Sequence, residues 1–253
     1  MQTSDGKEII AGCEPWSADG GPHGALVLHG FTGNPQGLRG LAKAFAARGF
    51  AVELPLLPGH GTAVDDMVTT RWDDWSGAAE AAYRSLADRV DKVVVAGLSM
   101  GGTLTCWLAE RYPEVAGIVL VNPAVDVPAE MLGPLQEMVD GGVDRIPAIG
   151  NDVADPEARE KAYDATPLEP LISLGAAAAH VRADLPKIAC PALILTSPQD
   201  HVVDPLNSEI VAGAVTGPVE RITLERSYHV ATLDYDKDLI EERAIAFARR
   251  VTG

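Results

Sequence analysis

The chain has 253 residues, of which 47% are hydrophobic and 22% are charged, so it can bury a sizeable core and is neither disordered nor fibrous in composition. Its 20 lysines and arginines against 36 aspartates and glutamates give a net charge of −16, which disfavours nucleic acid and anionic lipid as partners. The polar amino-terminal stretch and the lack of any run of 18 apolar residues predict no signal peptide and no transmembrane segment. We expect a cytoplasmic location, with transient contact at membrane surfaces as an alternative.

Short runs rich in β-branched residues alternate along the chain with amphipathic segments. The runs have the length and composition of buried strands, and they span residues 24–30, 50–56, 92–98, 117–123, 191–197 and 219–225. Helical periodicity occupies residues 37–49, 72–90 and 236–251. This alternation predicts the α/β class, with a mostly parallel sheet and helices on both faces.

One long segment interrupts the alternation. Between residues 126 and 187 we find no strand pattern, only helical pieces rich in proline. So long a connection is unusual within a compact domain, and open α/β sheets bind their ligands at the carboxyl edge. We therefore expect residues 126–187 to form a small helical cap over that edge. Residues 1–125 and 188–253 would form the core.

The sequence GLSMG, centred on Ser99, directly follows the strand predicted at 92–98 and precedes a helical pattern. In this context G-x-S-x-G predicts a nucleophile elbow, a sharp and strained turn that presents the serine hydroxyl at the edge of the sheet. Glycines at positions 97 and 101 would let the strand and the helix approach closely. Ser99 is therefore the candidate nucleophile, and a structural serine is the alternative.

A serine nucleophile needs a histidine base and an acid that orients the histidine, and after an elbow the acid precedes the histidine in the chain. His229 lies between the last strand and the last helix, whereas His201 has no acid upstream of it in its loop except the adjacent Asp200. For the acid, Asp200 lies nearest a strand end. Asp204 precedes proline and has the character of a helix cap, and Asp126 is a third candidate. We favour His229 and Asp200.

The tetrahedral oxyanion formed by serine attack needs two backbone amides. We expect one from Met100, the residue after the nucleophile, and one from Phe31, in the loop that follows the first predicted strand. His29 in the same loop is expected to hold the turn through hydrogen bonds rather than to take part in catalysis.

Five motifs together resemble the α/β-hydrolase family, and within it the bacterial monoacylglycerol lipases and the small carboxylesterases. In chain order they are LHGFTGNP, LPGHG, GLSMGG, PQDHVVDP and SYHVATLDYDKD. The resemblance covers essentially the whole chain. It implies the α/β-hydrolase fold, a triad of Ser99, Asp200 and His229, an oxyanion hole from the amides of Phe31 and Met100, and no metal or cofactor.

The expected reaction is hydrolysis of small carboxylic esters, above all monoacylglycerols, through an acyl-enzyme intermediate. Methionines suit a pocket that takes chains of several shapes, and apolar cap side chains would hold the acyl chain, among them Leu132, Met138 and Ile149. For the polar head group we favour Glu160 over Glu157, because residues 160–167 resemble the same lipases. A solvated role for either glutamate is the alternative.

Other functions use the same triad. A short-chain carboxylesterase, a thioesterase and an acyl-sugar esterase stay open, and a non-catalytic ligand-binding homologue is a more distant alternative. The serine at the elbow excludes epoxide hydrolases and haloalkane dehalogenases, which need a carboxylate there. Three scattered cysteines, at positions 13, 106 and 190, predict neither a disulfide framework nor a zinc site. The sequence assigns no oligomeric state.

Overall fold

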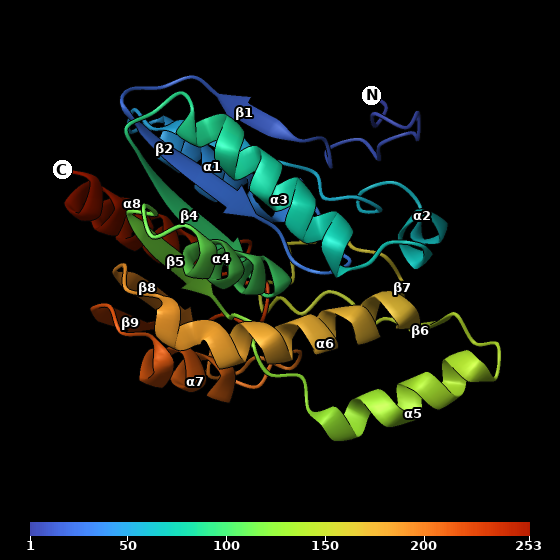
Figure 1. Cartoon of the computed structure of the whole chain (residues 1–253). Helices are drawn as coiled ribbons and strands as arrows, with labels where there is room; N and C mark the ends of the chain where they lie inside the picture. The colour runs from blue at the N-terminus through green and yellow to red at the C-terminus, as the bar shows by residue number, and fades with distance from the viewer.

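A central sheet of seven strands organises the structure (Figure 1). The computed structural model describes residues 1–253, apart from the side chain of Ala129. The strand order is β1-β3-β2-β4-β5-β8-β9, in which β1 pairs antiparallel with β3 and the remaining neighbours are parallel. The strands are β1 (Trp16–Ala18), β2 (His23–Leu28), β3 (Ala51–Leu54), β4 (Lys92–Leu98), β5 (Gly117–Val121), β8 (Ala192–Thr196) and β9 (Val219–Thr223).

Helices cover both faces of this sheet. One core lies beneath α3 (Trp72–Ala87), α4 (Met100–Arg111), α6 (Leu168–Asp184) and α7 (Leu206–Ala214). The other lies beneath α1 (Arg39–Ala46) and α8 (Lys237–Thr252).

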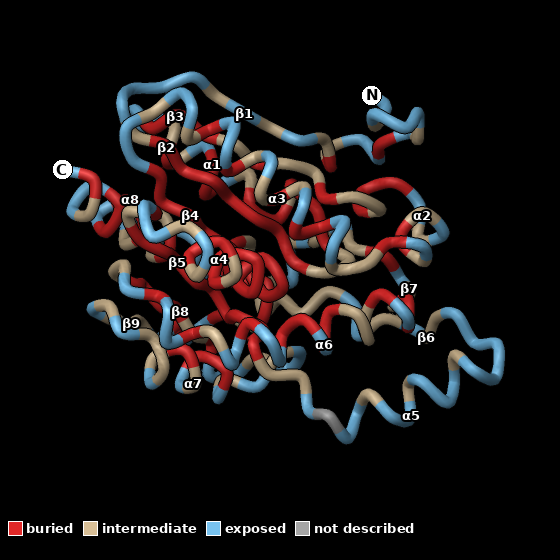
Figure 2. The backbone as a smooth tube through the Cα atoms, in the orientation of Figure 1, coloured by how far each residue is buried: buried red, intermediate tan, exposed pale blue. Residues whose placement is uncertain are grey.

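Successive residues of the central strands point to opposite cores, as the pleat requires: Val93 and Val95 join the first, whereas Val94 and Ala96 join the second. Both faces of these strands are therefore buried (Figure 2). This explains why the strands are continuous apolar runs in the sequence.

The α/β class and the six predicted strands are confirmed, as are the three helical segments, with ends that agree to within three residues. β1 is an edge strand of three residues, too short to produce a periodic pattern, and the sequence analysis does not predict it. Three short helices lie between these elements: η1 (Pro35–Leu38), α2 (Val64–Val68) and η2 (Leu185–Lys187).

The segment between residues 126 and 187 contains two strands, so the expectation of none was wrong. β6 (Arg145–Pro147) and β7 (Ala165–Pro167) pair antiparallel with each other, outside the main sheet. Each has three residues and ends in proline, which removes the alternation that identifies a strand. α5 (Ala129–Asp140) lies on the outer side of α6 and is largely exposed, whereas α6 packs onto the core (Figures 1 and 2). The division of the chain into core and cap stays a prediction.

Among the described residues, no helix combines the length and the apolar composition needed to span a bilayer.

Candidate active site

Ser99 occupies a sharp turn between β4 and α4. Its backbone angles, φ 56° and ψ −120°, lie in a region that residues other than glycine rarely populate. The turn is tight because a Cβ on Gly97 would lie 2.0 Å from the carbonyl oxygen of Gly101, and a Cβ on Gly101 would lie 2.0 Å from that of Leu28. Only glycine fits at these two positions, so the elbow geometry predicted from the sequence is present.

The loop after β2 lies directly against this turn. A Cβ on Gly30 would come within 3.3 Å of the Cβ of Ser99 and 3.9 Å of its Oγ. Met100 is the first residue of α4, where a backbone N–H has no partner within the helix. Among the described residues, neither the Met100 amide nor the Phe31 amide donates a hydrogen bond. Two free donors are therefore available in the segments that flank the serine.

His29 and His60 pack beneath this loop as neutral side chains. Nε2 of His29 accepts the amide of Leu57 at 3.1 Å, and the two imidazole centroids are 5.0 Å apart. Burial lowers the pKa of His29 to about 3 and that of His60 to about 4. His29 therefore holds the turn, as expected, and neither residue carries a positive charge near neutral pH.

Asp200 and His229 are in direct contact. Oδ2 of Asp200 accepts a hydrogen bond from Nδ1 of His229 at 2.6 Å. The side chain of Asp200 is 1% exposed and that of His229 is 8% exposed. The other oxygen of Asp200 accepts the amides of Val202 and Val203, each at 2.8 Å. This second set of bonds fixes the carboxylate and leaves one oxygen for the histidine.

The sheet topology explains why these residues meet. Ser99 follows β4, Asp200 follows β8 and His229 follows β9, and β4, β5, β8 and β9 are consecutive parallel neighbours. Since the carboxyl ends of parallel strands share one edge, the three loops gather there. The structure thus brings Asp200 and His229 into contact at the edge that carries the serine turn.

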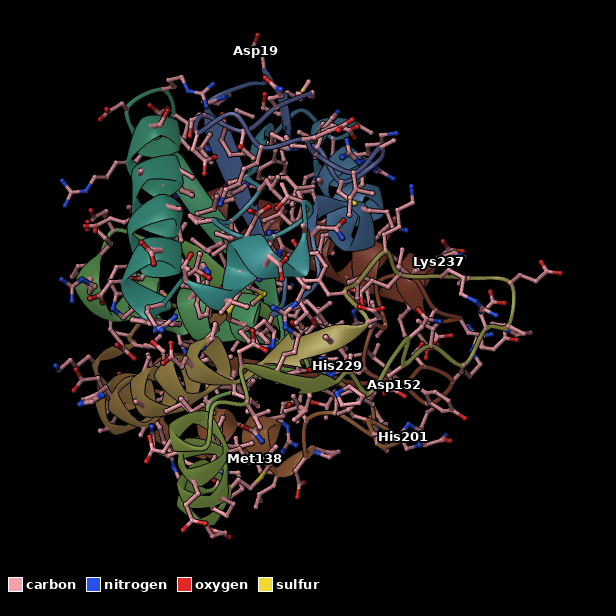
Figure 3. All side chains as sticks on the ribbon, turned by 90° about the vertical axis from the view of Figure 1, so that its right-hand side faces the viewer. Asp19, Met138, Asp152, His201, His229 and Lys237 are labelled. Atoms are coloured by element: carbon pink, nitrogen blue, oxygen red, sulfur yellow. The ribbon has the colours of Figure 1, made fainter. Side chains whose placement is uncertain are left out.

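The rejected candidates have other partners. The carboxylate of Asp204 accepts a hydrogen bond from the amide of Leu206 at 2.9 Å, just before α7, although Pro205 and not Asp204 is the N-cap residue of that helix. Asp126 forms an ion pair with Arg182 at 2.6 Å. His201 faces solvent and contacts Asp152 instead of a core acid (Figure 3).

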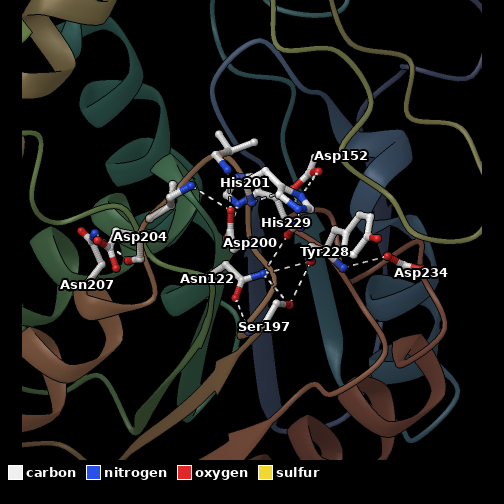
Figure 4. A network of polar contacts seen from close by, with 12 residues as sticks. Asn122, Asp152, Ser197, Asp200, His201, Asp204, Asn207, Tyr228, His229 and Asp234 are labelled. Carbon is white, nitrogen blue, oxygen red and sulfur yellow. Dashed lines mark hydrogen bonds and ion pairs between the residues drawn. The ribbon is translucent and has the colours of Figure 1, made fainter.

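Three further residues hold the His229 loop, and the sequence did not reveal them (Figure 4). Asn122, at the end of β5, has a positive φ of 44° and donates from Nδ2 to the carbonyl oxygen of His229 at 2.8 Å. Asp152 accepts the amide of His229 at 3.0 Å. Asp234 is fully buried and accepts the amide of Tyr228 at 2.9 Å. A polar residue directly after a strand was the one available signal, and it applied to Asn122 alone.

Glu160 enters this region from the segment between β6 and β7. A Cβ on Gly33 would lie 2.8 Å from its Oε1, so the carboxylate contacts the loop that carries Phe31. Burial raises the pKa of the Glu160 carboxyl, and the charge of nearby His229 acts in the opposite direction. Glu157 is exposed. Of the two glutamates weighed for the head group, Glu160 is therefore the one placed beside the candidate site.

The apolar cap residues are largely open to solvent. Ile149 is 70% exposed. Met138, on α5, is 37% exposed and is labelled in Figure 3. Leu132 contacts α6, where a Cβ on Gly175 would lie 2.8 Å from its Cδ2. Their role in holding an acyl chain stays a prediction.

The described residues offer no evident metal site. Among them, no group of three His, Cys, Asp or Glu side chains is arranged to hold an ion. The chemistry available at this edge is that of a serine hydroxyl, a carboxylate-bound imidazole and free backbone amides.

Comparison with known proteins places this geometry in a family. The pattern described as "Alpha/beta hydrolase family" matches residues 25–242. A thermostable monoacylglycerol lipase of Bacillus sp. (strain H-257) is 44% identical over 250 residues, which is 97% of this chain and 98% of the lipase. A carboxylesterase of Bacillus subtilis (strain 168) is 26% identical over 94% of this chain and 97% of its own length. A solved structure from work on LipS and LipT, two metagenome-derived lipolytic enzymes, has a TM-score of 0.92 and 42% identity, over 96% of this chain and all of that one.

Proposed function

The chain belongs to the alpha/beta hydrolase family and is a carboxylic ester hydrolase, and we propose that its substrates are monoacylglycerols. We assign the chemistry to Ser99, Asp200 and His229. The observation that carries this assignment is the 2.6 Å contact between Asp200 and His229 at the sheet edge where Ser99 occupies its strained turn. A serine nucleophile, a base and an orienting acid are the parts that acyl transfer needs.

The proposed reaction has two halves. In the first, His229 takes the proton of Ser99, the alkoxide attacks the ester carbonyl, and the amides of Phe31 and Met100 stabilise the oxyanion. His229 then protonates the leaving glycerol. In the second half, a water activated by His229 hydrolyses the acyl-enzyme and frees the fatty acid. Asp200 holds the imidazole in the tautomer whose Nδ1 carries hydrogen and stabilises the imidazolium that forms.

The substrate class is supported by two features of different kinds. The relative with 44% identity is named a monoacylglycerol lipase. In this chain, the carboxylate of Glu160 lies beside the loop of Phe31, where it can accept hydrogen bonds from the hydroxyls of a glycerol head group. The second candidate is a general carboxylesterase, favoured by the 26% identity to the Bacillus subtilis enzyme.

A matched substrate panel tests the proposal. Purified protein would be given 1-monoacylglycerols and methyl esters of the same fatty acids, together with one diacylglycerol, one acyl thioester and short 4-nitrophenyl esters. We expect the highest kcat/KM for medium or long monoacylglycerols. Fast turnover of short 4-nitrophenyl esters with neglect of monoacylglycerols would move the protein to the carboxylesterases.

Two variants sharpen this test. Ser99→Ala should be inactive on every ester. Glu160→Ala should raise KM for monoacylglycerols roughly 10-fold, the value of one hydrogen bond, and leave methyl esters nearly unchanged. Equal effects on both ester classes would remove Glu160 from head-group recognition. Exposed Glu157→Ala is the matched control and should behave like the parent enzyme.

A further inference from the structure

A carboxylate from outside the proposed triad contacts both loops that carry the acid and the base. Oδ2 of Asp152 accepts the amide of His229 at 3.0 Å and the amide of His201 at 3.2 Å (Figure 4). Its Oδ1 lies 2.8 Å from Nδ1 of His201. Asp152 belongs to the segment between β6 and β7, far from both loops in sequence, and its side chain is 10% exposed.

These contacts close a ring of four residues. Asp200 contacts His229, His229 contacts Asp152, Asp152 contacts His201, and His201 is the covalent neighbour of Asp200. The Asp200–His229 pair and the Asp152–His201 pair are therefore linked through hydrogen bonds and one peptide bond. Any shift of the loop after β8 relative to the loop after β9 must stretch a hydrogen bond to Asp152.

The peptide groups on either side of His229 are held from opposite directions. Asp152 accepts its N–H from the cap side, and Asn122 donates to its carbonyl oxygen from the sheet side. Because a ring can be aimed only as accurately as its backbone is fixed, both contacts bear on where the imidazole points.

A second carboxylate attaches the same cap segment independently. Asp234 accepts the amides of Ala154 at 2.7 Å and Asp155 at 3.0 Å, in addition to that of Tyr228 at 2.9 Å. The main-chain carbonyl of Asp152 also accepts the amide of Val230 at 3.1 Å. The cap segment would therefore stay attached after loss of the Asp152 side chain, and this permits a specific test of the carboxylate.

We propose that Asp152 is a positioning residue, through which the cap aligns His229 with Asp200. Its carboxylate contacts the backbone amide of His229 and not the imidazole, and it acts by fixing the two loops relative to each other. Without it, the imidazole would sample orientations in which the proton transfers of the proposed reaction are misaligned. The inference rests on the proposed function, since it assigns a role within the same site.

The experiment compares Asp152→Ala and Asp152→Asn with Asp155→Asn. Asp155 is a neighbouring cap acid whose carboxylate accepts only the amide of Glu157 among the described residues. kcat is measured per active site, counted by titration with a fluorophosphonate, so that unfolded protein does not enter the value. The hydrogen-bonded Nδ1 proton of His229 is followed in the downfield region of the proton NMR spectrum.

For Asp152→Ala we expect kcat per site to fall roughly 10- to 100-fold, as misplaced catalytic groups do, with KM within about two-fold. The Nδ1 resonance should broaden or disappear. Asp152→Asn keeps an acceptor oxygen for the two amides and should be intermediate, whereas Asp155→Asn should match the parent. These changes, with normal melting, would support the proposal.

Unchanged kcat per site and an unchanged Nδ1 resonance in both Asp152 variants would overturn the positioning role. If Asp152→Ala does not fold, Asp152→Asn decides by the same two measurements. Ser99→Ala separates this outcome from failure of the proposed function: an inactive Ser99→Ala with fully active Asp152 variants overturns the positioning role alone. An active Ser99→Ala overturns both.

Discussion

Asp200 and His229 lie 29 positions apart in the chain, yet their side chains form a 2.6 Å hydrogen bond that is almost closed to solvent. Asp200→Asn should lower kcat by about 10⁴-fold, since an amide would favour the wrong imidazole tautomer. Asp204→Asn is the matched control, because its carboxylate bonds to the amide of Leu206 instead. Steady-state kinetics on a medium-chain monoacylglycerol distinguish the two variants, and equal losses in both would contradict the assignment of the acid.

The backbone strain at Ser99 should appear as a stability difference between two inactive variants. Ser99→Ala and Ser99→Gly both remove the hydroxyl, and each should lower kcat on the order of 10⁵- to 10⁶-fold. Only glycine relieves the strain at φ 56°. Glycine also has more conformational entropy in the unfolded chain, which offsets part of this gain. The free energy of unfolding of Ser99→Gly should therefore exceed that of Ser99→Ala by about 1 kcal/mol. Urea denaturation measures this difference, and an alanine variant of equal or greater stability would show that the turn is not strained.

Close packing at the elbow makes Gly101 far more sensitive than a helical glycine elsewhere. A methyl group on Gly101 would meet the carbonyl oxygen of Leu28 at 2.0 Å, so Gly101→Ala should cost about 3 kcal/mol or more and abolish activity. Gly77, inside α3, has no atom within 4 Å of an added Cβ. Gly77→Ala should therefore stabilise the helix by roughly 0.5–1 kcal/mol. Thermal and urea unfolding of both variants test the opposite signs.

A half-buried carboxyl at the far end of α4 should make stability depend on pH. Burial raises the pKa of Glu110 from 4.5 to about 8, and among the described residues its Oε1 has no hydrogen-bond partner. The protonated form is thus favoured in the folded state. Its contribution to stability is complete below pH 4.5 and is lost as the pH rises to about 8.

Glu110→Gln removes this loss. The variant should be more stable than the parent by ~1 kcal/mol at pH 9, after allowance for partial solvent screening, with the advantage shrinking towards pH 4. Exposed Glu114→Gln serves as the control and should show no such dependence. The free energy of unfolding, measured by urea titration at several pH values, decides. An advantage independent of pH would show that Glu110 is not protonated in the folded protein.

The serine turn could be found from sequence because its causes are local. Five apolar strand residues, the glycines at positions 97 and 101 and the start of a helix lie within about ten positions, and each constrains its immediate neighbours. The strands on either side are buried on both faces, so their apolar runs are continuous and easy to recognise. The choice of Asp200 over Asp204 also had a local basis, since a proline after an aspartate marks the start of a helix.

The support around His229 could not be found in this way. Asp152 lies 77 positions from His229 and 49 from His201. Nothing in the residues next to Asp152 distinguishes it from the other acids of the cap. Its partners are set by the order of β8 and β9 in the sheet and by the path of the cap across their ends.

The sequence by itself determined the α/β class, the elbow at Ser99 and the chain order of the candidate acid and base, because each depends on short-range periodicity or on the steric needs of a single turn. Only the tertiary structure decided which carboxylate meets which histidine. Asp200 with His229 and Asp152 with His201 are contacts between loops, made when parallel strands bring their carboxyl ends to one edge. The same packing buries Asp200, whose side chain is 1% exposed, and no short stretch of sequence reveals that burial.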